Sequence, residues 1–152
     1  ANKDVAFYCI GVYTGQVPVD EFKRITVDFT RTFCETLYNH SPQAAFCFLS
    51  GQGADQTEQS SILFAKQKGI AENIILNQGF GRTHLFRPGY IYPDTPRKEP
   101  NQAYKLMRFL YKPVAMVYPN IGVSSTKLAT KMFTVGLFGG EKTIYENSDI
   151  RN

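Results

Sequence analysis

The stretch AAFCFLSGQGADQTEQSSILFAKQKG, residues 44–69, decides the fold. It begins with an apolar run of strand length, continues into a polar turn rich in Gly and Gln, and predicts a helix over residues 57–77. Phe64 and Lys68 lie four residues apart on this helix and therefore share one face. Because α/β sheets bind ligands where the carboxyl ends of strands open into such turns, we expect the functional site here.

The flanking segments repeat the pattern. Residues 4–10 are a continuous apolar run that stops at Gly11, which predicts a strand buried on both faces of a parallel sheet. A helix over residues 18–39 and a third strand over residues 83–87 follow the same alternation. Strands and helices at this spacing indicate right-handed parallel crossovers, so the predicted fold is α/β, a doubly wound parallel sheet with helices on both faces. The apolar face of the helix over residues 18–39 comprises Val19, Phe22, Ile25, Phe29, Phe33 and Leu37.

Beyond Gly89 the pattern loosens. Residues 90–100 contain three prolines and are expected to form a long loop, a candidate lid over a substrate or cofactor. A helix is expected over residues 102–111. Ser124 or Ser125 is expected to cap another helix, which Gly139 and Gly140 end, and residues 142–145 form a short final strand.

Composition bounds the class of protein. A chain of 152 residues, 43% hydrophobic and 20% charged, predicts one globular domain spanning residues 1–152. The net charge of +4 is scattered, so nucleic acid binding is not expected. Two histidines without ligand spacing predict no metal site, and the three cysteines are expected to be reduced and buried. With no apolar run of the roughly 18 residues that span a bilayer, the protein is expected to be cytoplasmic.

Five segments, in chain order, resemble the carboxyl-terminal two thirds of an atypical short-chain dehydrogenase/reductase. The segments are DVAFYCIG, FLSGQGAD, FAKQKGIAE, HLFRPGYIY and YENSDIR, and they are most similar to the branch of Tat-interacting oxidoreductases and NmrA-like proteins. The resemblance implies a Rossmann domain that binds NAD or NADP. It also implies that the amino-terminal βαβ unit, which carries the glycine-rich phosphate turn, is missing, because the GQG of residues 51–53 follows the wrong strand.

In that family the chemistry depends on a Ser, a Tyr and a Lys. Lys68 stands in the position of the lysine, whereas Phe64 stands in the position of the tyrosine. The family serine corresponds better to Gly51 than to Ser50. Because phenylalanine carries no titratable proton, the usual proton transfer to a carbonyl cannot pass through it. Either the cofactor site is kept without the standard carbonyl chemistry, or another group acts. The candidates for that group are Tyr90, Tyr92 and His84.

The resemblance also implies a set of cofactor contacts: Gly11 at the adenosine ribose, Pro88 and Gly89 at the nicotinamide amide, and Ser50 and Lys68 at ribose hydroxyls. Each residue has a structural interpretation as well. Lysines on helices are often only solvated charges, and glycine and proline at strand ends often serve the turn alone. Ser50 and Lys68 are the catalytic candidates.

Two functions from different classes follow. The first is an NAD(P)-dependent oxidoreductase, or a relative with a degenerate site, acting on a small-molecule carbonyl substrate. The second is a non-catalytic protein that senses a dinucleotide or binds a protein partner. A third hypothesis is an assembly protein without a ligand, a homodimer formed through the helix over residues 57–77. Phe64 can also be read as a packing residue, His40 as a helix-end cap, and His84 as a core residue.

Overall fold

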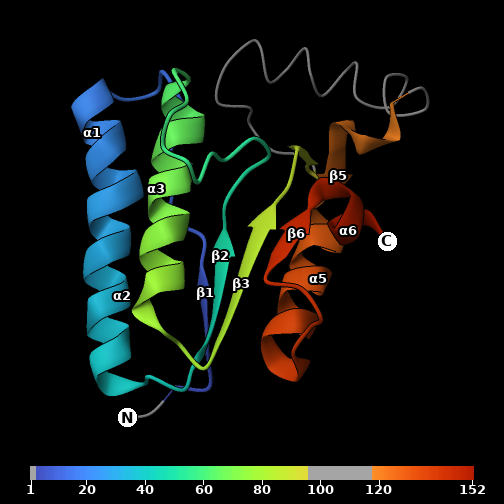
Figure 1. The fold of residues 1–152 in the computed structure, drawn as a ribbon. Helices are drawn as coiled ribbons and strands as arrows, with labels where there is room; N and C mark the ends of the chain where they lie inside the picture. The colour runs from blue at the N-terminus through green and yellow to red at the C-terminus, as the bar shows by residue number, and fades with distance from the viewer. Residues whose placement is uncertain (1–2, 96–117) are drawn as a thin grey trace.

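The computed structural model describes residues 3–95 and 118–152 (Figure 1). Four strands form one sheet in the order β1-β2-β3-β6, and each neighbouring pair is parallel. The predicted parallel α/β sheet is therefore confirmed, and the short final strand joins it as the fourth member. The strands are β1 (Val5–Tyr8), β2 (Ala45–Leu49), β3 (Arg82–Arg87) and β6 (Ile144–Glu146).

Helices cover both faces of this sheet, α1 to α3 on one side and α5 and α6 on the other (Figure 1). Successive residues of a strand point to opposite faces, so the continuous apolar run of β2 supplies two cores. Phe46 and Phe48 pack in the core that includes residues of α2 and α3, whereas Cys47 packs in the core that includes α5. This doubly wound, Rossmann-like arrangement is the predicted fold class. The helices are α1 (Val19–Lys23), α2 (Phe29–His40), α3 (Leu63–Gln78), α5 (Ser125–Phe138) and α6 (Asn147–Arg151).

The prediction that residues 4–10 are buried on both faces is wrong. β1 pairs only with β2 and lies at the edge of the described sheet. Phe7 and Ile10 are 39% and 49% exposed. Cys9, which follows the end of β1, is also exposed, unlike Cys34 and Cys47. All three cysteines are free thiols.

The predicted helix over residues 18–39 forms, but its apolar face is shifted. A π-helical segment, η1 (Arg24–Asp28), separates α1 from α2. A π turn holds more residues than an α turn and rotates the following residues around the helix axis. Phe29 and Phe33 are consequently 42% and 38% exposed, whereas Thr30 and Cys34 are buried. At the end of α2, the Nδ1 of His40 lies 2.8 Å from the carbonyl oxygen of Thr36, which agrees with the predicted role of His40 as a helix-end cap.

α3 begins at Leu63, six residues later than predicted. The carboxylate of Asp55 accepts hydrogen bonds from the backbone amides of Thr57, Gln59 and Ser60, which holds this segment in a turn. The same segment lies directly against α3, because a Cβ on Gly69 would overlap the carbonyl of Asp55. The loop between β2 and α3 is thus fixed on the helix that carries Lys68.

The segment after β3 differs from the predicted loop. Tyr90–Tyr92 is a strand, β4, which pairs in parallel with β5 (Gly122–Ser124), and η2 (Pro119–Ile121) precedes β5. Ser124 caps α5 as predicted, accepting a hydrogen bond from the amide of Lys127. Asp94 accepts a hydrogen bond from the amide of Thr126, which attaches the described part of the predicted lid to the start of α5. The remainder of that lid, and the helix predicted over residues 102–111, lie outside the described residues.

Candidate functional site

The carboxyl ends of β1, β2 and β3 meet at one edge of the sheet, where a hollow of about 520 Å³ opens. Parallel strands end on the same side, so loops that are distant in the sequence line it together. All five residues predicted to contact a cofactor are among its lining residues. The hollow is lined by residues 9–14, 49–51 and 88–91, by Phe64 and by Lys68.

Lys68 extends from α3 and is only 7% exposed. Its Nζ donates a hydrogen bond to the carbonyl oxygen of Leu49 at 3.1 Å and lies 4.6 Å from the centre of the Phe48 ring. Burial lowers the pKa of Lys68 to about 8, although the charges of Glu72 and Cys9 act in the opposite direction. Within residues 3–95 and 118–152 no carboxylate forms an ion pair with this ammonium, so its burial has a free-energy cost.

Phe64 and Gly51 depend on one another. The tip of the Phe64 ring lies so close to Gly51 that a Cβ at residue 51 would overlap it. The two positions to which the resemblance assigns the family Ser and Tyr therefore touch in space. A side chain at residue 51 therefore requires the Phe64 ring to move.

The hydroxyl of Ser50, a residue that lines the hollow, already has a hydrogen-bond partner. It donates a hydrogen bond to Oε1 of Glu72 at 2.5 Å, and Ser50 is 7% exposed. Glu72 is fully buried and also accepts hydrogen bonds from Gln56 and, at both carboxylate oxygens, from Arg87. The hydrogen bonds between Arg87 and Glu72 raise the pKa of the Arg87 guanidinium, which Glu146 also contacts at 3.0 Å. Ser50 is thus part of a buried ionic network that joins β2, α3 and β3.

This network was not predicted from the sequence. Its signals are present, since Glu72 lies one turn after Lys68 on the same helix face and Arg87 is a charged residue at the end of a buried strand. Neither signal identifies the partner, because the hydroxyl of Ser50 and the carboxylate of Glu72 are 22 residues apart in the chain.

Gly89 and Gly11 differ in what the structure requires of them. A Cβ on Gly89 would lie 2.5 Å from the carbonyl oxygen of Ile121, and the Gly89 amide donates to Oδ1 of Asn147 at 2.8 Å. Packing alone therefore demands glycine at residue 89. A Cβ on Gly11 would meet only Nζ of Lys68, at the ordinary contact distance of 3.9 Å, so Gly11 lies open to the hollow.

The three other candidates for proton transfer lie in different places. Tyr90 lines the hollow. Tyr92 pairs with Ser124 in the ladder of β4 and β5. The Nδ1 of His84 donates to the carbonyl oxygen of Lys142 at 2.9 Å, and its buried Nε2 has no hydrogen-bond partner among residues 3–95 and 118–152. Of these three residues, the structure brings Tyr90 to the site that holds Lys68.

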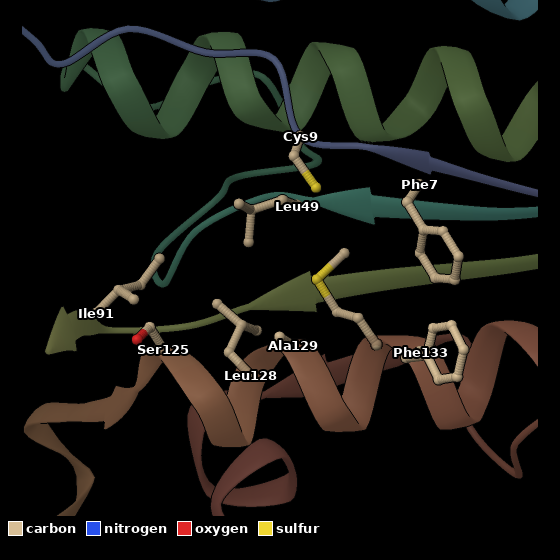
Figure 2. A pocket seen from close by; sticks show the side chains of 9 residues that line it. Phe7, Cys9, Leu49, Ile91, Ser125, Leu128, Ala129 and Phe133 are labelled. Carbon is tan, nitrogen blue, oxygen red and sulfur yellow. The ribbon is translucent and has the colours of Figure 1, made fainter. Parts of the chain in front are cut away.

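A second cavity of about 360 Å³ lies on the α5 side of the sheet (Figure 2). Its walls are almost entirely apolar, and the rings of Phe7 and Phe133 stack on one another at one end of it with centroids 6.2 Å apart. Cys9, Leu49 and Ile91 line both this cavity and the hollow, so the two spaces adjoin at the ends of β1 and β2.

No protein-family model matches the chain. The chain is 31% identical to Protein HTATIP2 of Rattus norvegicus over 99 residues, which are 65% of this chain and 40% of the rat protein. The chain is a partial homologue of that protein. It spans less than half of the rat protein's length, and its parallel sheet agrees with the resemblance that the motifs gave. No helix in the described ranges is long and apolar enough to cross a membrane.

Proposed function

We propose that this chain is part of an NAD(P)-binding protein of the short-chain dehydrogenase/reductase type, in the NmrA-like branch, whose Ser/Tyr/Lys site is degenerate. One observation carries the proposal: Gly11, Lys68, Pro88 and Gly89 lie around one hollow at the carboxyl ends of parallel strands. That is where doubly wound sheets bind dinucleotides. The partial homology with the rat protein supports the same family.

The residues present fit the nicotinamide and ribose end of a dinucleotide. The ammonium of Lys68 makes one hydrogen bond within the described part of the chain, and its other N–H groups can reach ribose hydroxyls. Gly11 leaves space beside it. The hollow lies within the roughly 300–1,000 Å³ typical of small-molecule sites. The fit is poorer at Ser50, whose hydroxyl already donates to Glu72.

A second function, a non-catalytic dinucleotide sensor or protein-interaction protein, is favoured by Phe64 and Gly51. The Phe64 ring fills the space that a Cβ at residue 51 would need, so this pair offers neither a phenol nor a serine hydroxyl. Proton transfer to a carbonyl by the family's usual tyrosine is therefore lost. Binding of the dinucleotide does not depend on that proton, so it survives under both functions.

Calorimetric titration of the full natural protein with NADPH and with NADH tests the proposal. We expect binding of at least one dinucleotide. Lys68→Met should weaken it by about tenfold or more, because a hydrogen bond from a charged donor contributes roughly 1.5–3 kcal/mol. Lys66→Met is the matched control, since Lys66 is exposed on the same helix. Absence of binding by the wild-type protein, or equal effects of the two substitutions, would contradict the proposed site.

Turnover separates the two functions. The double change Phe64→Tyr with Gly51→Ser restores both family groups, and a rise in NAD(P)H oxidation on a panel of aldehydes and ketones supports a degenerate enzyme. A double variant that binds the dinucleotide normally and stays inert on the whole panel supports the sensor. Phe64→Tyr alone serves as the control, because it adds the phenol without the serine hydroxyl and leaves Gly51, which has no Cβ, in contact with the ring.

A further inference from the structure

We propose that Lys68 is a nucleophilic amine that forms an imine with an apolar aldehyde or ketone admitted to the hollow. This activity differs from dinucleotide binding and does not depend on it. It rests on the surroundings of one side chain: Lys68 lines the hollow although the residue is only 7% exposed, and its Nζ lies 3.9 Å from the position of a Cβ on Gly11, which lines the same hollow.

Nothing in the described ranges neutralises this nitrogen by ion pairing. Its hydrogen-bond partner is a carbonyl oxygen, that of Leu49, and the nearest ring is that of Phe48. Glu72, one turn along α3, is occupied by Ser50, Gln56 and Arg87. An amine that is desolvated and unpaired is the form of lysine that attacks carbonyl groups.

The charge state of Lys68 supports this geometry. Burial brings its pKa down to about 8. The titratable groups facing it are Glu72 on its own helix and the thiol of Cys9 at the end of β1, and both favour the ammonium. Tyr13 lines the same hollow. Burial outweighs these charges, so a substantial fraction of Lys68 is the neutral amine near pH 8.

The chemistry balances without an oxidant or a reductant. The Nζ lone pair attacks the carbonyl carbon, a carbon–nitrogen bond forms, and the carbonyl oxygen gains a proton that the nitrogen loses through water. The carbon–oxygen bond of the resulting carbinolamine then breaks, and the hydroxyl group leaves as water with the remaining hydrogen of the nitrogen, which leaves the carbon–nitrogen double bond. The net change is amine plus carbonyl compound to imine plus water.

The walls of the hollow select the carbonyl compound. Ile10, Val12, Leu49, Phe64 and Ile91 present apolar side chains around Lys68. An aldehyde with an aromatic or aliphatic substituent is therefore preferred over a small charged aldehyde such as glyoxylate.

Reductive trapping tests the inference. The full natural protein is incubated at pH 8 with benzaldehyde and sodium cyanoborohydride, which reduces imines, and peptide mass spectrometry locates the benzyl groups. We expect Lys68 to be labelled about tenfold or more faster than Lys66, because the Lys68 amine is buried and desolvated whereas Lys66 is exposed on the same helix. Labelling of Lys68 should level off above pH 8, and glyoxylate should label it more slowly than benzaldehyde.

The controls separate this inference from the proposed function. Lys66→Arg should leave the rate at residue 68 unchanged, and Lys68→Arg should remove that adduct while other lysines react as before. Equal rates at Lys66 and Lys68 in the wild-type protein would overturn the inference, even if NADPH binds. Rapid labelling of Lys68 in a protein that binds neither NADPH nor NADH would support the inference and contradict the dinucleotide proposal.

Discussion

Replacing Lys68 with methionine should change the way in which the protein's stability depends on pH. Burial lowers the pKa of Lys68 from 10.5 to about 8 in the folded protein. In the unfolded chain the side chain is hydrated and titrates near its ordinary value. Between pH 8 and pH 10.5 the unfolded state therefore binds more protons than the folded state, and the free energy of unfolding of the wild-type protein rises with pH.

The size of this effect follows from the pKa shift. One pKa unit corresponds to about 1.4 kcal/mol, so the shift from 10.5 to about 8 amounts to on the order of 3 kcal/mol across the whole window. Below pH 8 both states are protonated, and the cost of burying the ammonium is fully present. Above pH 10.5 both states are neutral and the cost is gone. Methionine does not titrate, so Lys68→Met should lack this gain entirely.

Urea unfolding of the wild-type protein, Lys68→Met and Lys66→Met at several values between pH 7 and pH 10 measures the effect. The free energy of unfolding of Lys68→Met, relative to that of the wild-type protein, should fall by about 1.4 kcal/mol for each pH unit between pH 8 and pH 10. Lys66→Met should keep the wild-type slope, because Lys66 is exposed. If the free energies of unfolding of the wild-type protein and Lys68→Met changed with pH in parallel, the reasoning that Lys68 is buried at a cost to its charged form would be refuted.

Three further predictions concern the surroundings of the site. Glu72→Gln should destabilise the protein by about 3–5 kcal/mol in chemical denaturation, because it removes the fully buried charge partner of the largely buried Arg87. Glu146→Gln, at a half-exposed carboxylate on the same arginine, should change the unfolding free energy by no more than about 1 kcal/mol, and equal losses would contradict this prediction. Gly51→Ala should lower stability by about 1–3 kcal/mol, and Phe64→Leu in the same chain should recover part of the loss in a double-mutant cycle. A thiol reagent at pH 8 should label Cys9 alone until denaturant is added, since burial raises the pKa of both other thiols to about 12; a second rapidly reacting thiol would show that the folded core opens.

The fold was predictable because its signals are local. The apolar runs that became β2 and β3, and the glycines that end α3 and α5, are properties of neighbouring residues. The exposure of Phe7 was not predictable, because it depends on which strand lies beside β1. The late start of α3 was missed for another reason. The carboxylate of Asp55 satisfies backbone amides in a turn, and this competes with the helix that periodicity alone suggests.

The sequence predicted which residues lie together around the hollow, but it did not predict the hydrogen bonds among them. Parallel strands bring their carboxyl ends together, which placed Gly11, Lys68 and Pro88 around one hollow. The hydrogen bond from Ser50 to Glu72 joins residues on a strand and a helix, and no spacing rule encodes it. The second apolar cavity likewise depends on where α5 packs against the sheet.

The most direct test of the central claim, that the hollow at the ends of the parallel strands binds a nicotinamide dinucleotide, is an amide NMR titration of the full natural protein with NADPH and NADH. We predict that the shifted amide signals concentrate on residues 9–14, 49–51 and 88–91, together with Lys68. Shifts that cluster instead at the polar recess formed by residues 139–142 at the end of α5, or no shifts at saturating dinucleotide, would contradict the claim.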